Sequence, residues 1–351
     1  MQRNLPLDGL RGVAVLMVFL LHHDYLNMGW MGVDVFFALS GFLITSILRR
    51  MREDQHYWGE FWIKRVTRIL PPLLVTILIV PVFRLHSSAA QLAAYVFSLG
   101  DYLAYARPKY ETLQSLWSLS VEEHFYIVWP FAVRFMRKIA LLYLIAALLL
   151  LESVLRAAVS IHHHAFMLIY YTTPFRLDGL LIGAMLAVLF ESSGKKAIIG
   201  RFSAATAVGL AVAYTGLRVG FGLRFTKDAN SSIFYNLSVY PLVALGSAAL
   251  VAYVLTHSES VSARLLSSRP VVFLGSISYG LYLYQVPIRE IVTHATGMTN
   301  RHAFFIDLPL TILFSWLSFK FYELPLVDWG KKKAQTMRLT VELRTGTTKT
   351  A

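Results

Sequence analysis

The sequence predicts an all-α, polytopic membrane protein: a bundle of about ten transmembrane helices with both termini in the cytoplasm. Composition is the first observation behind this class, because 56% of the 351 residues are hydrophobic and only 15% are charged. Soluble domains contain about 25% charged residues. The mean hydropathy of +0.55 agrees. The second observation is that apolar runs recur along the whole chain, with lengths close to those needed to cross a bilayer, about 20 residues.

Ten such runs follow one another, and each predicts a helix. No small-residue cleavage site follows the first run, so we expect it to remain in the mature protein rather than to leave as a signal peptide. The runs are 7–25, 31–48, 69–85, 117–136, 139–159, 174–191, 203–220, 233–255, 270–290 and 304–323. A further run, 89–105, is short and is broken by Gly100 and Asp101. We expect it to re-enter the membrane or to lie in the interface.

Clusters of Lys and Arg set the predicted orientation, because such clusters collect on cytoplasmic loops. Five clusters fall at alternate helix ends, at 49–68, 134–138, 195–201, 264–269 and 331–333. They also account for the net charge of +13, so no nucleic-acid partner is expected. The prediction is one membrane domain over residues 1–329 and a polar, disordered cytoplasmic tail over 330–351. The chain has no cysteine, which excludes disulfides and thiolate chemistry.

The first helix carries ionisable residues that are costly in lipid. Arg11 and His22 are eleven residues apart, so they lie on one helical face about 16 Å apart along the axis. Asp8 lies on the same side, as a cap or as a partner for Arg11, whereas His23 points about 100° away from His22. Ionisable residues inside a membrane are functional candidates. Snorkelling to the two interfaces is the alternative for Arg11, and a structural role is the alternative for His22.

A basic cluster stands where the third helix begins. Lys64 and Arg68 are four residues apart on one helical face, and Arg65 is beside them. Topogenic charge explains such a cluster by itself. The functional alternative is a clamp for a cytoplasmic ligand that carries phosphates, because guanidinium groups match phosphate geometry.

The segment WSLSVEEHFY at 117–126 opens the fourth helix, on the predicted outer side. Ser120 or Ser118 suits an N-cap, and Glu122 and Glu123 suit a first helical turn. Trp117 stands at a belt-like position. Acids here also suit proton transfer or hydrogen bonding to a hydroxyl-rich ligand.

Other polar residues mark three later helices. Arg176 and Asp178 stand at a helix entrance, where pairing with each other is the simplest interpretation. Polar residues inside the ninth run are candidates for substrate contact or for helix–helix hydrogen bonds. They are Tyr279, Tyr282 and Gln285, and Glu323 stands near the inner end of the last helix. The triplet 162–164 is three histidines, but consecutive residues diverge by about 100° on a helix, so no metal site is expected.

Together and in this order, these stretches resemble the acyltransferase type 3 family of integral membrane O-acyltransferases, over roughly residues 5–326. The resemblance rests on Arg11 with ten residues before His22 and on six motifs. The motifs are GVDVFFALSGFLI at 32–44, FWIKRVTRILP at 61–71, WSLSVEEHFY, FRLDGLLIGA at 175–184, ISYGLYLYQVP at 277–287 and YELP at 322–325. Each motif alone is weakly specific, but the six motifs in this order and at this spacing are a specific signal.

The resemblance implies an enzyme of a bacterial cytoplasmic membrane that moves an acyl group, most often acetyl, from cytoplasmic acyl-CoA to a hydroxyl. The implied acceptor is an extracytoplasmic carbohydrate or glycolipid, with a small molecule such as a macrolide as the alternative. Acyl-CoA is a substrate, and no permanently bound cofactor or metal is implied. The implied catalytic residues are Arg11, His22 and Glu122.

By the same resemblance, Lys64, Arg65 and Arg68 bind the donor. Supporting or substrate-binding candidates are Asp8, Asp34, Ser40, Trp117, Ser120, Glu123, Arg176, Asp178, Tyr279, Tyr282, Gln285 and Glu323. Two positions depart from the family, which usually has Gln at His124 and His at Gln285. Histidine at position 22 suits a general base, and it also suits an acyl carrier. A transporter or flippase, and a non-catalytic sensor, are the rival classes.

Overall fold

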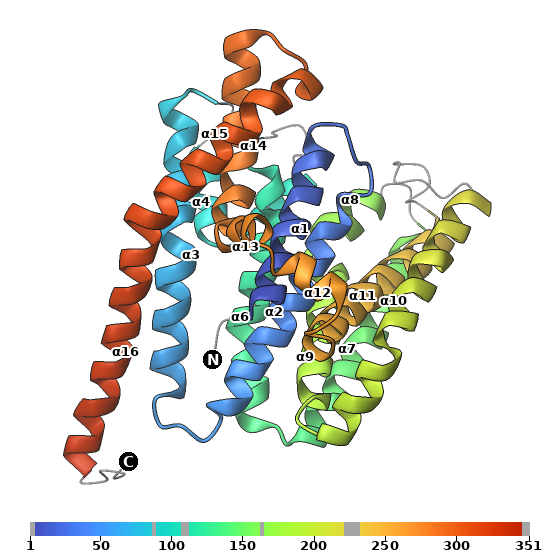
Figure 1. The fold of residues 1–351 in the computed structure, drawn as a ribbon, viewed down its shortest axis with the longest axis vertical. Helices are drawn as coiled ribbons and strands as arrows, with labels where there is room; N and C mark the ends of the chain where they lie inside the picture. Colours follow the sequence, from blue (N-terminus) through green and yellow to red (C-terminus); the bar gives the residue numbers. More distant parts are fainter. Residues whose placement is uncertain (1–3, 86–88, 107–111, 162–164, 221–231, 346–351) are drawn as a thin grey trace.

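The computed structural model describes residues 4–85, 89–106, 112–161, 165–220 and 232–345, and within these ranges every element is a helix. They form one membrane-type bundle (Figure 1). In chain order the elements are α1 (Leu5–His22), α2 (Met31–Arg50), α3 (Tyr57–Val82), α4 (Ala89–Val96), α5 (Gly100–Ala106), η1 (Gln114–Leu116), α6 (Trp117–Phe135), α7 (Lys138–Val159), α8 (Ala165–Tyr171), η2 (Thr173–Phe175), α9 (Asp178–Leu189), α10 (Ser193–Gly220), α11 (Ile233–Thr256), α12 (Val261–Leu266), α13 (Arg269–Ser276), α14 (Ser278–Thr296), α15 (Asn300–Ser318), η4 (Phe319–Glu323) and α16 (Leu324–Thr345).

The all-α prediction is confirmed, and among the described residues seven helices are long and apolar enough to cross a membrane. The number rises to eight if α13 and α14, which meet at an angle of 72°, count as one span. The remaining two of the ten predicted runs lie on α6 and α9. Helix α9 has only 12 residues, and α6 carries Glu122, Glu123 and Arg134 within its 19 residues. Both nevertheless pack in the interior of the bundle.

The run 89–105 forms two short helices rather than a span. Helices α4 and α5 have eight and seven residues, too few to cross a bilayer. Between them Ser98 takes a left-handed conformation with φ of 60°. The Gly100 amide donates to Ser120 Oγ, and Ser98 Oγ donates to the Glu123 carboxylate. This broken segment is therefore held against α6, as expected for a re-entrant or interfacial element.

Helix pairs at the centre approach closely because glycine replaces larger residues at the contacts. A Cβ atom on Gly41 of α2 would lie 2.0 Å from the Leu180 carbonyl oxygen of α9. A Cβ atom on Gly275 of α13 would lie 1.7 Å from the Asp8 carbonyl oxygen of α1. Small residues at such contacts let membrane helices pack through their backbones. They fix α1, α2, α9 and α13 relative to one another.

Helix α16 runs through most of the segment expected to be a disordered tail. The helix continues from α15 through a π-helical turn and extends to Thr345. Ala334 is buried, and a Cβ atom on Gly330 would lie 2.5 Å from Thr67 Oγ1, so α16 packs alongside α3 (Figure 1). Composition alone missed this helix because a polar segment can be either a disordered tail or a polar helix. Here the residues are good helix formers that extend an existing helix, which avoids a new nucleation step.

Candidate active site

A large cavity opens among α1, α2, α3, α6, α14 and the turn between α9 and α10. Its volume is about 840 Å³. The α2 residues that line it extend from Phe36 to Arg50, which corresponds to about 21 Å along the helix axis. Figure 1 shows that α1 begins part-way up the bundle, whereas α2 and α3 continue to its lower end. We call the end where α2 finishes and α3 begins the basic end.

Positive charge dominates the lining of this cavity. Among the residues that the structure describes, six cationic and three acidic side chains line it, which gives these residues a formal charge of +3. The cations are Arg11, Arg49, Arg50, Arg65, Arg68 and Lys196, and the acids are Asp8, Glu122 and Glu191. The structure thus brings together residues of α1, α3 and α6 that the sequence singled out separately. Such a lining attracts an anionic ligand.

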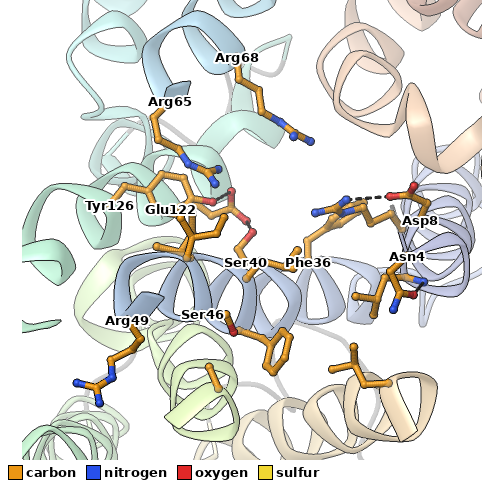
Figure 2. A pocket seen from close by; sticks show the side chains of 18 of the residues that line it. Asn4, Asp8, Phe36, Ser40, Ser46, Arg49, Arg65, Arg68, Glu122 and Tyr126 are labelled. Carbon is orange, nitrogen blue, oxygen red and sulfur yellow. Dashed lines mark hydrogen bonds and ion pairs between the residues drawn. The ribbon is translucent and has the colours of Figure 1, made fainter. Parts of the chain in front are cut away.

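Glu122 lies inside this cavity and accepts two hydrogen bonds. Ser40 Oγ of α2 donates at 2.8 Å and Tyr126 Oη donates at 2.9 Å. The Arg65 guanidinium lies 5.3 Å from the centre of the Tyr126 ring. Figure 2 shows Arg65 next to Glu122 and Tyr126, with Arg68 beside it. Glu122 therefore organises the residues of this cavity around Arg65.

The start of α6, where Glu122 lies, is enclosed by protein. Residues 117–121, the first five of α6, are all buried. The helix thus begins among buried residues of the bundle, directly after the 3₁₀ turn η1. Hydropathy locates an apolar run but does not say how its first residues pack, so this burial was not accessible from the sequence.

On α1, Arg11 is paired locally. Its Nη1 donates to Asp8 Oδ1 at 3.1 Å, whereas the helix cap is Asn4, whose Oδ1 accepts from the Leu7 amide. Asp8 is therefore placed as the partner of Arg11 rather than as the cap. Both side chains line the cavity.

Of the three basic residues at the start of α3, only two reach the cavity. Lys64 Nζ donates to Glu60, on the flank of α3 that faces Lys331 and Gln335 of α16. The flank differs because Lys64 and Arg65 diverge by about 100° around the helix. Arg65 and Arg68 point into the cavity.

Sequence reasoning missed the cations at the mouth of the cavity. Arg49, Arg50 and Lys196 were assigned only to topology, although their clustering at adjacent helix ends was visible. Arg49 donates to Glu191 through Nε at 2.6 Å, and Lys138 Nζ lies 3.1 Å from the same carboxylate. Partial burial raises the pKa of Glu191, but these two cations outweigh it and lower the pKa below its ordinary value.

His22 lies outside the cavity. It is the last residue of α1 and is not among the described residues that line the cavity. The side chain of Gln285 lies against its imidazole, and Arg289 Nη1 donates to its carbonyl oxygen at 2.7 Å. Both partners come from α14. The eleven-residue spacing from Arg11 puts His22 about 16 Å farther along α1.

His23 is buried and tied to α15. Its Nδ1 lies 2.9 Å from the Phe19 carbonyl oxygen, and its Nε2 lies 2.6 Å from Asp307 Oδ2. A carbonyl oxygen only accepts, so Nδ1 carries a proton and a further proton is shared between Nε2 and Asp307. His23 therefore anchors the end of α1, on a different side from His22.

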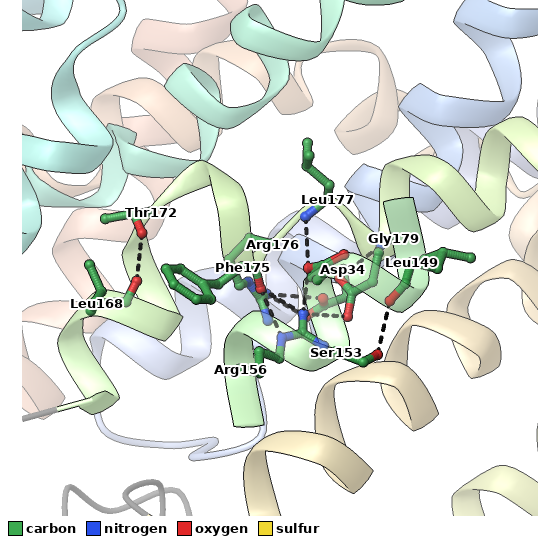
Figure 3. Close-up of polar contacts among 12 residues, drawn as sticks. Asp34, Leu149, Ser153, Arg156, Leu168, Thr172, Phe175, Arg176, Leu177 and Gly179 are labelled. Carbon is green, nitrogen blue, oxygen red and sulfur yellow. Dashed lines mark hydrogen bonds and ion pairs between the residues drawn. The ribbon is translucent and has the colours of Figure 1, made fainter. Parts of the chain in front are cut away.

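A buried ion-pair network joins α2, α7 and α9 (Figure 3). Arg176 Nη2 donates to both Asp34 oxygens, at 3.0 and 3.1 Å. Arg156 Nη2 lies 2.7 Å from both Glu152 and Asp178. The simple pairing of Arg176 with Asp178 is thus wrong, because each residue bonds to a different helix.

Two residues of this network, Glu152 and Arg156, were missed. Their spacing of four residues inside an apolar helix was the available signal. The Arg176 guanidinium also lies 4.8–5.9 Å from the ring centres of Phe37, Trp117, Tyr170 and Tyr240. This encloses the charge in aromatic faces. Trp117 is therefore part of the framework rather than of an interfacial belt.

The remaining candidates contribute hydrogen bonds between elements. His124 Nδ1 and Asp101 Oδ2 both lie 2.6 Å from Thr173 Oγ1, which connects α5, α6 and η2. Tyr279 lines the cavity and donates to the Ile69 carbonyl. Glu323 accepts from Ser318 Oγ at the π-helical turn. No group of three or more His, Cys, Asp or Glu suited to a metal occurs in the described ranges, and residues 162–164 lie outside them.

Comparisons with known proteins agree with this arrangement of motifs. A family model described as "Acyltransferase domain" matches residues 4–320. The O-acetyltransferase OatA of Staphylococcus aureus, from strains MRSA252 and NCTC 8325, is 30% identical over 372 residues, covering 96% of this chain and 60% of the relative. The chain therefore spans about three fifths of the length of these relatives. No solved structure matches the chain.

Proposed function

The chain belongs to the acyltransferase 3 family, and from that premise we propose that it transfers an acetyl group from acetyl-CoA to a hydroxyl group. The observation that carries the proposal is the cationic cavity of about 840 Å³. Coenzyme A is elongated and carries phosphate groups, which arginine binds well. The relatives named O-acetyltransferases support acetyl as the group transferred.

The proposed orientation follows from charge. Basic clusters favour the cytoplasmic side of a membrane, so the basic end faces the cytoplasm and the donor enters there. Arg65 and Arg68 hold phosphates, Arg49, Arg50 and Lys196 draw the donor into the mouth, and the thioester points toward Arg11. Glu122 keeps Arg65 in place through Tyr126 and takes no direct part at His22. Lys64 is outside this donor site.

We assign the acetyl-transfer step to His22. The acceptor oxygen attacks the thioester carbonyl, its proton passes to the imidazole, and the sulfur leaves and is protonated to give free coenzyme A. Imidazole suits this work because one ring nitrogen can accept a proton while the other donates a hydrogen bond. In the alternative course, the imidazole first takes the acetyl group and then passes it to the acceptor. An acceptor at the end opposite the basic end is a carbohydrate or glycolipid of the bacterial envelope.

The test uses purified protein in lipid nanodiscs with acetyl-CoA. We expect release of free coenzyme A together with one acetyl increment on an envelope glycan, detected by mass spectrometry. His22→Ala is expected to abolish transfer and to retain coenzyme A binding. The exposed His302→Ala is the matched control. Coenzyme A release by His22→Ala at the wild-type rate removes His22 from the mechanism, and transport without acetylation favours the transporter class.

A further inference from the structure

One stripe of side chains on α14 connects the cavity to His22. Ser278, Tyr282, Gln285 and Arg289 are four, three and four residues apart, so they share one helical face. Ser278 lines the cavity, whereas Gln285 and Arg289 contact His22. The stripe is eleven residues long, or about 16 Å, and it matches the distance that α1 covers from the cavity to its end. Tyr282 occupies the level between them.

Contacts on three sides hold the Tyr282 side chain between the level of the cavity and the level of His22. Its hydroxyl donates to the Ser115 carbonyl oxygen and hydrogen-bonds with Ser118 Oγ. Its ring meets Phe36 edge-on, with 6.3 Å between ring centres, and Phe36 is itself a wall of the cavity. The side chain is partly buried, and it also packs against buried hydrophobic residues of three core clusters. Its ring and its hydroxyl group therefore both hold it in place.

We propose that Tyr282 separates the donor cavity from His22, and that its side chain must turn away for the acyl thioester to reach that histidine. The proposal rests on the proposed function, because it takes the thioester in the cavity and the chemistry at His22. It makes Tyr282 a residue that selects the acyl group by size. Each added methylene must pass Tyr282 and Phe36, and a close-packed passage discriminates against extra methylenes.

The first test removes only the hydrogen bonds of the Tyr282 hydroxyl group. Tyr282→Phe keeps the ring and deletes the hydroxyl group that bonds to Ser115 and Ser118. We expect acetyl-CoA hydrolysis in the absence of acceptor to rise about fivefold, the effect of losing one net hydrogen bond that holds the closed position. Binding of coenzyme A should remain within twofold of wild type. Tyr284→Phe is the matched control, because its hydroxyl bonds to Ser318 Oγ on another side of α14.

The second test measures acyl selection. Tyr282→Ala opens the passage, so the rate with butyryl-CoA relative to acetyl-CoA is expected to rise about tenfold or more. Tyr284→Phe should leave that ratio unchanged. If wild type shows no reaction with acetyl-CoA, the proposed function fails. If wild type reacts and both Tyr282 variants match it in hydrolysis and in donor ratio, the separating role of Tyr282 is overturned.

A third measurement compares one double variant with and without a cross-link, so any folding defect of the substitutions is common to both states. The chain contains no cysteine, so Ser118→Cys with Tyr282→Cys can be bridged by a short bis-methanethiosulfonate linker. We expect the bridged protein to bind coenzyme A but to lose transfer to less than a tenth of the unbridged rate. Reductant should restore it. Full transfer by the bridged protein contradicts the proposal.

Discussion

Replacing both Arg65 and Arg68 by Gln removes two of the six cations found among the described lining residues and lowers the formal charge of that lining from +3 to +1. Arg65 is partly buried and Arg68 is exposed. A charge-assisted hydrogen bond contributes about 1.5 kcal/mol at a partly buried site, and an exposed pair about 1 kcal/mol because solvent screens it. The double variant should therefore bind coenzyme A about 2.5 kcal/mol more weakly, or about 60-fold.

The assay is equilibrium binding of coenzyme A to the protein in nanodiscs, repeated at several salt concentrations. Lys64→Gln is the matched control, because it removes one positive charge from the same turn of α3 but from the flank that faces α16. Its dissociation constant should stay within twofold of wild type. Two results refute the reasoning: a double variant that binds within threefold of wild type, and a Lys64→Gln loss as large as that of Arg65→Gln alone.

Three further substitutions test other parts of the structure. Glu122→Gln removes a negative charge from the donor cavity, so coenzyme A should bind about fourfold more tightly, while the acceptor KM stays within twofold; a change confined to the acceptor KM contradicts the donor-side placement. Arg176→Met leaves Asp34 buried without its cation and should lower the free energy of unfolding by about 3–5 kcal/mol. The double variant Asp34→Leu/Arg176→Met should recover most of the lost thermal stability. Gly41→Val forces its side chain into a carbonyl oxygen of α9 and should cost about 3 kcal/mol, whereas Gly194→Ala meets no atom within 4 Å and should be neutral by the same melting measurement.

The helices were predictable because their signals are local. A run such as 139–159 is apolar over the length of a span, and α7 covers Lys138–Val159. Packing depth is not local. Trp117 looked like the interfacial start of a span, but it is buried in the bundle, and Glu122 lines the cavity together with Arg65. The broken α4–α5 segment was predictable from Gly100 and Asp101, which interrupt its apolar run.

The sequence predicted several residues of the candidate site, but it did not predict which residues they bond to. Arg11, Arg65 and Arg68 were all singled out and meet in one cavity. Pairing by proximity in sequence failed for Arg176 and Asp178, because a buried charge bonds to whichever helix brings an opposite charge within reach. The mouth cations at Arg49 and Arg50 looked like ordinary topology signals, because hydropathy does not distinguish a loop charge from one that lines a cavity.

The two residues that first marked α1 as unusual lie in separate places, and we propose separate roles for them. Arg11 lines the cationic cavity with Asp8, whereas His22 lies about 16 Å farther along the same face, against α14. A rigid protein with these positions holds the donor without exposing its thioester to the histidine. Water would otherwise compete with the acceptor, because closed sites suppress hydrolysis of a reactive group. Placing Tyr282 in the interval therefore gives the arrangement a chemical purpose: the thioester reaches His22 only when the passage opens.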